Sequence, residues 1–272
     1  MGYRGQRKHL KRTNAPKSYH LHKMGGAFAL KPICGPHSAK SSIPLAYLLR
    51  YNLKYAESNE EVRRIMKKRC IRINGQVRSI EKYPVGLFDI LSINKKHFYQ
   101  LVYNANGCFT LVKLDAQNPQ HTNTRLCKVL SRKVNHDNIP SIQTHDGTHL
   151  RFIHPMIRVN DTIRYDFVQK KIVEILPQKI GQTVMAIDGN NSGRIGVLTN
   201  IDKALNRNHS VTVKDARDKT FVTRLENIMV IGDSSGPSCP MLNEGIRYTH
   251  AETCLKKLVS GEQSIEDFEY QN

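Results

Sequence analysis

The sequence of 272 residues contains no tryptophan, no acidic residue before Glu57, and no apolar run of the roughly 20 residues that a membrane-spanning helix needs. A short apolar segment at residues 24–30 contains two glycines and lies between Lys23 and Lys31, so we do not interpret it as a secretory signal. Gln6 stands where the N-myristoylation pattern needs Ser or Thr. We therefore predict no membrane partner.

The cysteines are sparse as well: six of them, at positions 34, 70, 108, 127, 239 and 254, with no Cys-x-x-Cys pair. This spacing excludes a zinc ribbon or zinc knuckle of the usual kind, and without a secretory signal it indicates reduced thiols. His145, His149 and His154 lie near Asp146, but a strand-and-turn segment does not place such a spacing on one helical face. We predict no metal and no cofactor.

Motifs of catalysis are also missing. The glycine-rich loop at residues 188–193 is not followed by Gly-Lys-Ser/Thr or by a helix, so it is not a nucleotide-binding phosphate loop. No nucleophile elbow and no kinase or deaminase motif occurs. We therefore predict no enzymatic activity and no small-molecule substrate.

Positive charge is what the sequence has in excess. It contains 42 Lys and Arg against 23 Asp and Glu, for a net charge of +19. The first 100 residues hold 21 basic and only 5 acidic residues, whereas the remaining 172 are almost balanced. Such a charge repels itself and favours a polyanionic partner. With a membrane set aside, the composition indicates a nucleic-acid-binding protein of the cytosol or nucleus.

The chain divides into five segments, and its fold class is α+β with several small modules. We predict a basic N-terminal extension (1–42), a helix–helix–hairpin module (43–95), an antiparallel β domain (96–176), a small closed barrel of five strands (177–232) and a C-terminal extension with a short helix and an acidic end (233–272). The N-terminal extension cannot bury enough apolar surface to fold alone, so we expect an extended arm that becomes ordered on RNA.

The module at 43–95 carries the clearest local signals. A helix over 43–55 would place Leu45, Leu48, Leu49 and Leu53 toward the core and Tyr47, Arg50, Tyr51 and Lys54 on the opposite side. Ser58 and Glu61 form a capping box for a second helix over 59–69, with Val62, Ile65 and Met66 as its buried stripe. Asn74-Gly75 between two short strands predicts a tight hairpin, because both turn positions need positive φ.

Two segments resemble known RNA-associated motifs. Residues 43–95 resemble the αL-type RNA-binding motif, through Glu61 to Ile65, Ile73 to Val77, Pro84 and Asp89. Residues 181–198 resemble the KOW motif of ribosomal proteins and transcription elongation factors, which implies an SH3-like β-barrel.

The order of these motifs, with a basic extension in front and a β domain between them, resembles the eukaryotic and archaeal small-subunit ribosomal protein family conventionally numbered four with the suffix e. Further matching strings are Lys8 to Arg12, Gly35 to His37, Thr144 to Asp146, Val159 to Ile163, Gly193 to Val197 and Val213 to Ala216. The resemblance covers roughly residues 1–250. It implies a structural constituent of the small ribosomal subunit that binds small-subunit rRNA and neighbouring ribosomal proteins, supports translation and subunit assembly, and resides in the cytoplasm, with assembly in the nucleolus if the source is eukaryotic.

The expected rRNA contacts combine phosphate neutralisation with recognition of RNA shape. The glycines would allow close approach to an RNA backbone. The predicted RNA-binding residues are Arg4, Arg7, Lys8, Lys11, Arg12, Lys17, Arg50, Lys54, Arg63, Arg64, Lys67, Lys68, Arg72, Arg78, Gly189, Gly193, Arg194 and Gly196.

Two other functions share some of these features. An RNA-modifying enzyme, such as a pseudouridine synthase, uses the same helix–hairpin module but needs a catalytic Asp in a larger domain, and Asp115, Asp146 and Asp161 lack the expected Gly-Arg-Leu-Asp setting. A free elongation or regulatory factor would use the KOW segment to dock on a polymerase or ribosome.

Overall fold

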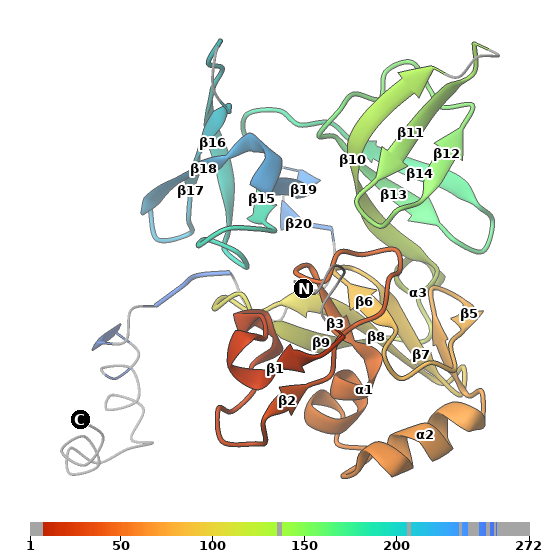
Figure 1. Cartoon of the computed structure of the whole chain (residues 1–272). Helices are drawn as coiled ribbons and strands as arrows, with labels where there is room; N and C mark the ends of the chain where they lie inside the picture. Colours follow the sequence, from red (N-terminus) through yellow and green to blue (C-terminus); the bar gives the residue numbers. More distant parts are fainter. Residues whose placement is uncertain are drawn as a thin grey trace, which may run out of the picture.

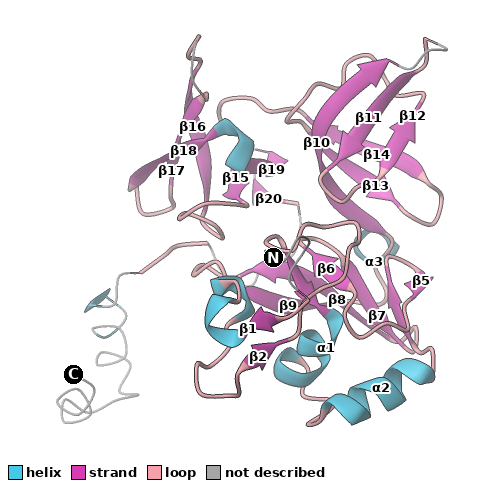
Figure 2. Ribbon diagram, viewed as in Figure 1, coloured by secondary structure: helices cyan, strands magenta, loops and turns pink. Residues whose placement is uncertain are grey.

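The computed structural model describes residues 8–134, 138–205, 208–233, 236–238, 245–248, 251–252 and 254. It is mostly β, with three antiparallel sheets of five or six strands and few helices. In Figure 1 the first sheet and the helices lie at the bottom, the second sheet at the upper right and the third sheet at the upper left. Figure 2 shows how little of the chain is helical.

The first sheet has the strand order β5-β4-β7-β8-β9. Its strands are β4 (Ile71–Ile73), β5 (Gln76–Val77), β7 (Ile90–Ile93), β8 (His97–Tyr103) and β9 (Phe109–Leu114). The predicted boundary at residue 95 does not separate two sheets, because β8 pairs with β7 from Ile90↔Gln100 to Ile93↔His97. The strands β8 and β9, which we assigned to the central β domain, therefore complete the sheet of the preceding module.

The helices of this module lie beside the first sheet. A short pair of β3 (Ser42–Pro44) and β6 (Pro84–Gly86) precedes α1 (Leu45–Tyr47), a π-helical turn η3 (Leu48–Asn52) and α2 (Asn59–Lys67). The predicted helix over 43–55 thus covers only residues 45–52, and a π-helical turn has more residues per turn than the 3.6 we assumed. Leu45, Leu48 and Leu49 are buried as expected.

The second sheet has the order β12-β11-β10-β13-β14. Its strands are β10 (Thr124–Val134), β11 (Pro140–Thr144), β12 (His149–Arg151), β13 (Thr162–Asp166) and β14 (Lys171–Leu176), and the short helix α3 (Pro119–Thr122) leads into it. Cys127, Ile142 and Ile163 are among the residues of its own small hydrophobic core. The sequence analysis missed β11, whose segment contains a single large apolar residue.

The third sheet has the order β18-β17-β16-β15-β19-β20. Its strands are β15 (Thr183–Ala186), β16 (Ile195–Asp202), β17 (Ser210–Lys214), β18 (Thr220–Arg224), β19 (Ile228–Asp233) and β20 (Gly236–Pro237), with the turn η4 (Leu225–Asn227) before β19. Within the described residues β18 and β20 do not pair, so the sheet is open where we expected a closed barrel of five strands. Most of the predicted C-terminal helix and the acidic end lie outside the described residues.

The N-terminal extension packs on the rest of the molecule instead of standing free. It contains β1 (Leu10–Lys11), η1 (Arg12–Asn14), η2 (Lys17–Tyr19) and β2 (Phe28–Ala29). Tyr19 is buried, and its ring lies 5.8 Å from the ring of Tyr47 in an edge-on arrangement. One hydrophobic core contains Tyr19 together with buried residues of the first and third sheets, such as Leu101 and Met185. The extension therefore gains from the module the apolar contacts that it cannot make alone.

A buried lysine joins the second and third sheets. Lys128 of β10 is fully buried, and its Nζ donates to the carbonyl oxygens of Glu226 at 2.6 Å and Ile228 at 2.7 Å. Burial lowers the pKa of this ammonium to about 8. The Nζ also lies 3.5 Å from the carbonyl oxygen of Leu225, and these contacts join β10 to the segment that leads into β19.

We expect Lys128→Met to lower the free energy of unfolding by about 2–3 kcal/mol, because two buried carbonyl groups lose a charge-assisted partner. Lys133→Met, on an exposed position of the same strand, should change it by less than about 0.5 kcal/mol. Urea denaturation of the two variants provides the measurement, and equal losses would contradict this role for Lys128.

Candidate nucleic-acid interface

The start of α2 follows from its capping residues. The Ser58 side chain accepts a hydrogen bond from the backbone N–H of Glu61 at 3.2 Å. The Glu61 carboxylate in turn accepts from the backbone N–H of Glu57 at 2.9 Å, which holds the pKa of Glu61 below its ordinary value. Val62 and Met66 are buried and Ile65 is half-buried, so this helix lies as predicted, with its basic face outward.

The outward face of α2 carries three exposed cations, Arg64, Lys67 and Lys68, and of these Arg64 helps to lower the pKa of Glu61. Arg63 is different, because its guanidinium forms two hydrogen bonds with the Glu81 carboxylate, at 3.0 and 3.3 Å. Glu81 therefore offsets the charge of Arg63, which we had predicted to bind RNA. Glu81 is 18 residues away in sequence, too far for any helical spacing to suggest it.

The residues after α1 present a smaller basic and aromatic surface. Arg50 donates to the Asn59 side chain at 2.9 Å and lies over the Tyr51 ring at 5.3 Å, while Tyr51 and Lys54 are exposed. Tyr47 lies beside this face as predicted, with its ring 5.5 Å from the ring of Tyr51, but it is not exposed. Tyr47 is buried, and its hydroxyl accepts from the backbone N–H of Leu30.

The β4–β5 hairpin forms at Asn74-Gly75, with φ of 50° and 79°, as the sequence predicted. Arg72 is half-buried on β4. Arg78 follows β5 and lies over the Tyr83 ring at 4.5 Å, with a hydrogen bond from its Nη2 to the Gln76 side chain. These contacts hold the guanidinium of Arg78 beside the hairpin without neutralising its charge.

The cations of the N-terminal extension divide into two groups. Lys8, Lys11 and Lys17 are exposed. Arg12 is directed into its own loop, where its guanidinium donates to the carbonyl oxygens of His22 and Gly25. The predicted contacts of Arg4 and Arg7 lie outside the described residues.

The glycine loop of the third sheet contacts protein, which differs from our expectation of an RNA-facing loop. Gly193, at φ 84°, packs so closely on the β8–β9 hairpin that a Cβ would lie 2.1 Å from the Asn104 carbonyl oxygen. A Cβ on Gly196 would lie 2.4 Å from the Lys214 carbonyl oxygen of the neighbouring strand. Gly189 is exposed, and its φ of 82° is a turn conformation that favours glycine. The glycines of this loop are therefore explained by turns and strand packing.

Arg194 is also used inside the protein. It forms an ion pair with the buried Asp215, donates to Asn191 and lies over the Phe221 ring at 4.0 Å. We therefore remove Arg194 from the candidate interface. The sequence analysis missed Arg247, which donates to the carbonyl oxygens of Ala105 at 2.9 Å and Ser192 at 2.8 Å and so fastens the glycine loop to the first sheet.

A buried ionic network lies behind the hairpin, and the sequence analysis did not find it. Arg125 of β10 forms ion pairs with Asp89, at 3.2 Å, and with Asp146, and both carboxylates are almost completely buried. The second Asp89 oxygen lies 2.8 Å from His37 Nε2. The Asn74 side chain donates to Asp89 at 2.8 Å. The network therefore joins the N-terminal extension, the hairpin and the second sheet.

The charges of this network depend on one another. Burial by itself would raise the pKa of Asp89 and of Asp146, but the facing cations and hydrogen bonds hold both below their ordinary values. Burial opposes a charge on His37, yet Asp89 outweighs it and raises the pKa of His37. At the neighbouring His145 burial outweighs the attraction of Asp146 and lowers the pKa to about 4. The network thus carries charge at Asp89, Asp146 and Arg125 at neutral pH.

Three known protein domains match consecutive parts of this chain. The RS4NT (NUC023) domain matches residues 4–40, the S4 domain matches residues 43–91, and Ribosomal family S4e matches residues 95–172. Small ribosomal subunit protein eS4 of Ixodes scapularis is 39% identical over 263 residues, covering 96% of this chain and 99% of the relative. The same protein of Carabus granulatus is 37% identical over 260 residues, covering 94% and 98%.

The chain belongs to the ribosomal S4e family. The crystal structure of the 30S ribosomal protein S4e from Thermoplasma acidophilum is similar, with a TM-score of 0.61 and 25% identity over 72% of this chain and 98% of that one. Family membership confirms the resemblance inferred from the sequence and decides against the RNA-modifying enzyme, because S4e proteins are ribosomal constituents.

Two further observations concern the described part of this S4e chain. No helix in it is both long and apolar enough to cross a membrane. Nor do three or more His, Cys, Asp or Glu side chains come together there in a group that could hold a metal ion.

We expect Arg125→Met to lower the free energy of unfolding of this S4e protein by about 3–5 kcal/mol, because two buried carboxylates lose their shared cation. Arg158→Met, on an exposed side chain of the same domain, is the matched control and should change it by less than about 0.5 kcal/mol. Guanidinium denaturation at pH 7 measures both, and similar midpoints for the two variants would show that the network does not stabilise the fold.

Proposed function

We propose that this chain is a structural, non-enzymatic constituent of the small ribosomal subunit that binds small-subunit rRNA. The observation that carries the proposal is the S4 domain with its exposed basic helix face, Arg64, Lys67 and Lys68, in a chain of the S4e family. These cations lie on a rigid helix whose opposite face is buried, so binding RNA requires little reordering of the protein.

The proposed mode of binding is recognition of RNA shape and phosphate. The grooves of an RNA duplex present phosphates and 2′-hydroxyl groups, and a rigid cationic surface recognises these without reading many bases. The helix α2 and the hairpin β4–β5 project from the same side of the first sheet (Figure 1). The proposed surface consists of the half-buried Arg72 and the exposed cations of this side and of the N-terminal extension: Lys8, Lys11, Lys17, Lys54, Arg64, Lys67 and Lys68.

The remaining modules receive other roles in this proposal. We assign residues 177–232 to a KOW-type, SH3-like module that contacts neighbouring small-subunit proteins, since its glycine loop and Arg194 are occupied within the chain. The five-segment division predicted from the sequence is retained, with β8 and β9 packing on the module at 43–95. The expected location is the ribosome in the cytoplasm, after assembly in the nucleolus if the source is eukaryotic.

The test compares two triple variants with the same loss of charge. Arg64→Gln, Lys67→Gln and Lys68→Gln together should weaken binding to a small-subunit rRNA transcript at least about tenfold near 0.1 M salt, and should reduce the salt slope by about 2–3. The control combines Lys171→Gln, Lys179→Gln and Lys203→Gln. These three lysines are exposed and lie in the segments 96–176 and 177–232.

Filter binding or fluorescence anisotropy gives both affinities. We expect the control to change affinity by less than about threefold, because these positions lie away from α2. Equal losses in the two triple variants would mean that α2 is not the interface and that binding follows net charge alone.

A further inference from the structure

A cavity of about 780 Å³ lies where three parts of the chain meet. Its walls come from the N-terminal extension at Gly35-Pro36, from the β4–β5 hairpin and the segment after it, and from the second sheet with the β13–β14 turn. This volume is within the range of sites that bind organic ligands. The cavity is therefore bounded by the same segments that the Asp89–Arg125–Asp146 network holds together.

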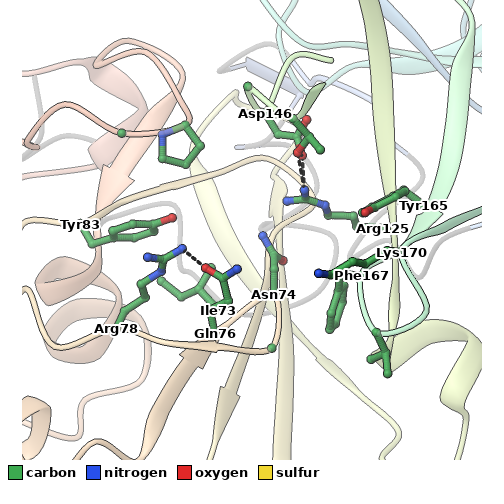
Figure 3. Close-up of a pocket in the computed structure, with 16 residues that line it drawn as sticks. Ile73, Asn74, Gln76, Arg78, Tyr83, Arg125, Asp146, Tyr165, Phe167 and Lys170 are labelled. Atoms are coloured by element: carbon green, nitrogen blue, oxygen red, sulfur yellow. Dashed lines mark hydrogen bonds and ion pairs between the residues drawn. The ribbon is translucent and has the colours of Figure 1, made fainter. Parts of the chain in front are cut away.

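Aromatic rings line the cavity on two sides. Tyr83 lies on the hairpin side, and Tyr165 and Phe167 lie on the side of the second sheet. Figure 3 shows Tyr83 with Arg78 on one side and Phe167 with Lys170 on the other, with Asn74 between them. The Phe167 ring packs closely on Gly75, since a Cβ at this position would lie 3.2 Å from two of its ring carbons. A planar ligand can therefore stack on rings that the fold holds in place.

The charge of the cavity favours an anion. Arg78, Arg125 and Lys170 line it, whereas Asp146 is its single acidic lining residue and is already paired with Arg125. Arg125 has a further donor: its side chain is only 10% exposed, yet within the described residues its Nε has no hydrogen-bond partner. In the part of the chain that the structure describes, the cavity thus has two cations without a carboxylate partner, Arg78 and Lys170, and one buried donor, Arg125 Nε, without an acceptor.

We propose that this cavity receives one unstacked nucleotide of small-subunit rRNA. Stacked aromatic rings and a cation beside them are how proteins hold bases that have left an RNA helix. An apolar peptide segment would leave the cations of Arg78 and Lys170 uncompensated. The proposal rests on the proposed function, and it adds a site for a single nucleotide to a surface that otherwise contacts phosphates.

The position of the cavity supports the same occupant. Arg78 lines it and also follows the hairpin that we assign to the rRNA surface, so an RNA strand that passes the hairpin comes directly to the cavity mouth. A bulged or looped nucleotide at that point could enter the cavity without disturbing the duplex contacts of α2.

The experiment is ultraviolet cross-linking of the full chain to a small-subunit rRNA transcript, followed by mass spectrometry of the cross-linked peptides. We expect one nucleotide to be attached to the peptide that contains Tyr83, Tyr165 or Phe167. Lys170→Glu should lower the yield on that peptide about tenfold at saturating protein, because a carboxylate then faces the nucleotide phosphate. Its exposed neighbour Lys171 lies outside the cavity, and Lys171→Glu should leave the yield within about twofold.

The other possible results separate the cavity proposal from the proposed function. Bound rRNA without cross-links on the cavity peptides, or equal effects of the two substitutions, would overturn the cavity proposal and leave the proposed function intact. Absence of rRNA binding would overturn the proposed function and, with it, the cavity proposal. In a parallel arm, a mixture of AMP, GMP, CMP and UMP is added to the free protein; a rise in its melting temperature that Lys170→Glu abolishes would assign the cavity to free nucleotides instead of rRNA.

Discussion

The buried pairing of Arg125 with Asp89 and Asp146 determines how the parts of this protein are arranged. Each of these charges would be costly in a desolvated position without the others, and His37 adds the N-terminal extension to the same network. The β4–β5 hairpin, the N-terminal extension and the second sheet are far apart in sequence. No strand of one of these parts forms backbone hydrogen bonds with a strand of another. Through this network the β4–β5 hairpin, which we propose to face RNA, and the wall of the cavity beside it take fixed positions relative to each other.

The sequence predicted well those features that depend on residues close together in the chain. Ser58 and Glu61 placed the start of α2, and Asn74-Gly75 placed the tightest hairpin, because capping and positive φ are local requirements. Features that depend on distant partners could not be predicted: the Arg63–Glu81 pair, the Arg194–Asp215 pair and the contact of Gly193 with Asn104. The burial of Tyr47 also depends on distant partners, because Tyr19 and the backbone N–H of Leu30 in the N-terminal extension cover it.

The excess of basic residues is used in two ways. One group stabilises the fold: Arg125 and Arg194 neutralise buried carboxylates, while Lys128 and Arg247 donate to backbone carbonyls. The other group is exposed and concentrated in the extension and the module at 43–95, where acidic residues are rare. Net charge therefore overstates the electrostatic contribution to RNA binding, and the exposed cations of the first third of the chain are the better measure of it.

The dependence of rRNA affinity on salt tests this account most directly, because it reports the number of phosphates that the protein neutralises. The eight cations of the proposed surface, seven of them exposed, predict a slope of log affinity against log salt of about −6 to −7 for the full chain. The measurement needs only a small-subunit rRNA transcript and a titration from about 50 to 200 mM salt. A slope shallower than about −3 would show that the exposed cations of the extension and of α2 do not contact phosphate, and would contradict the account.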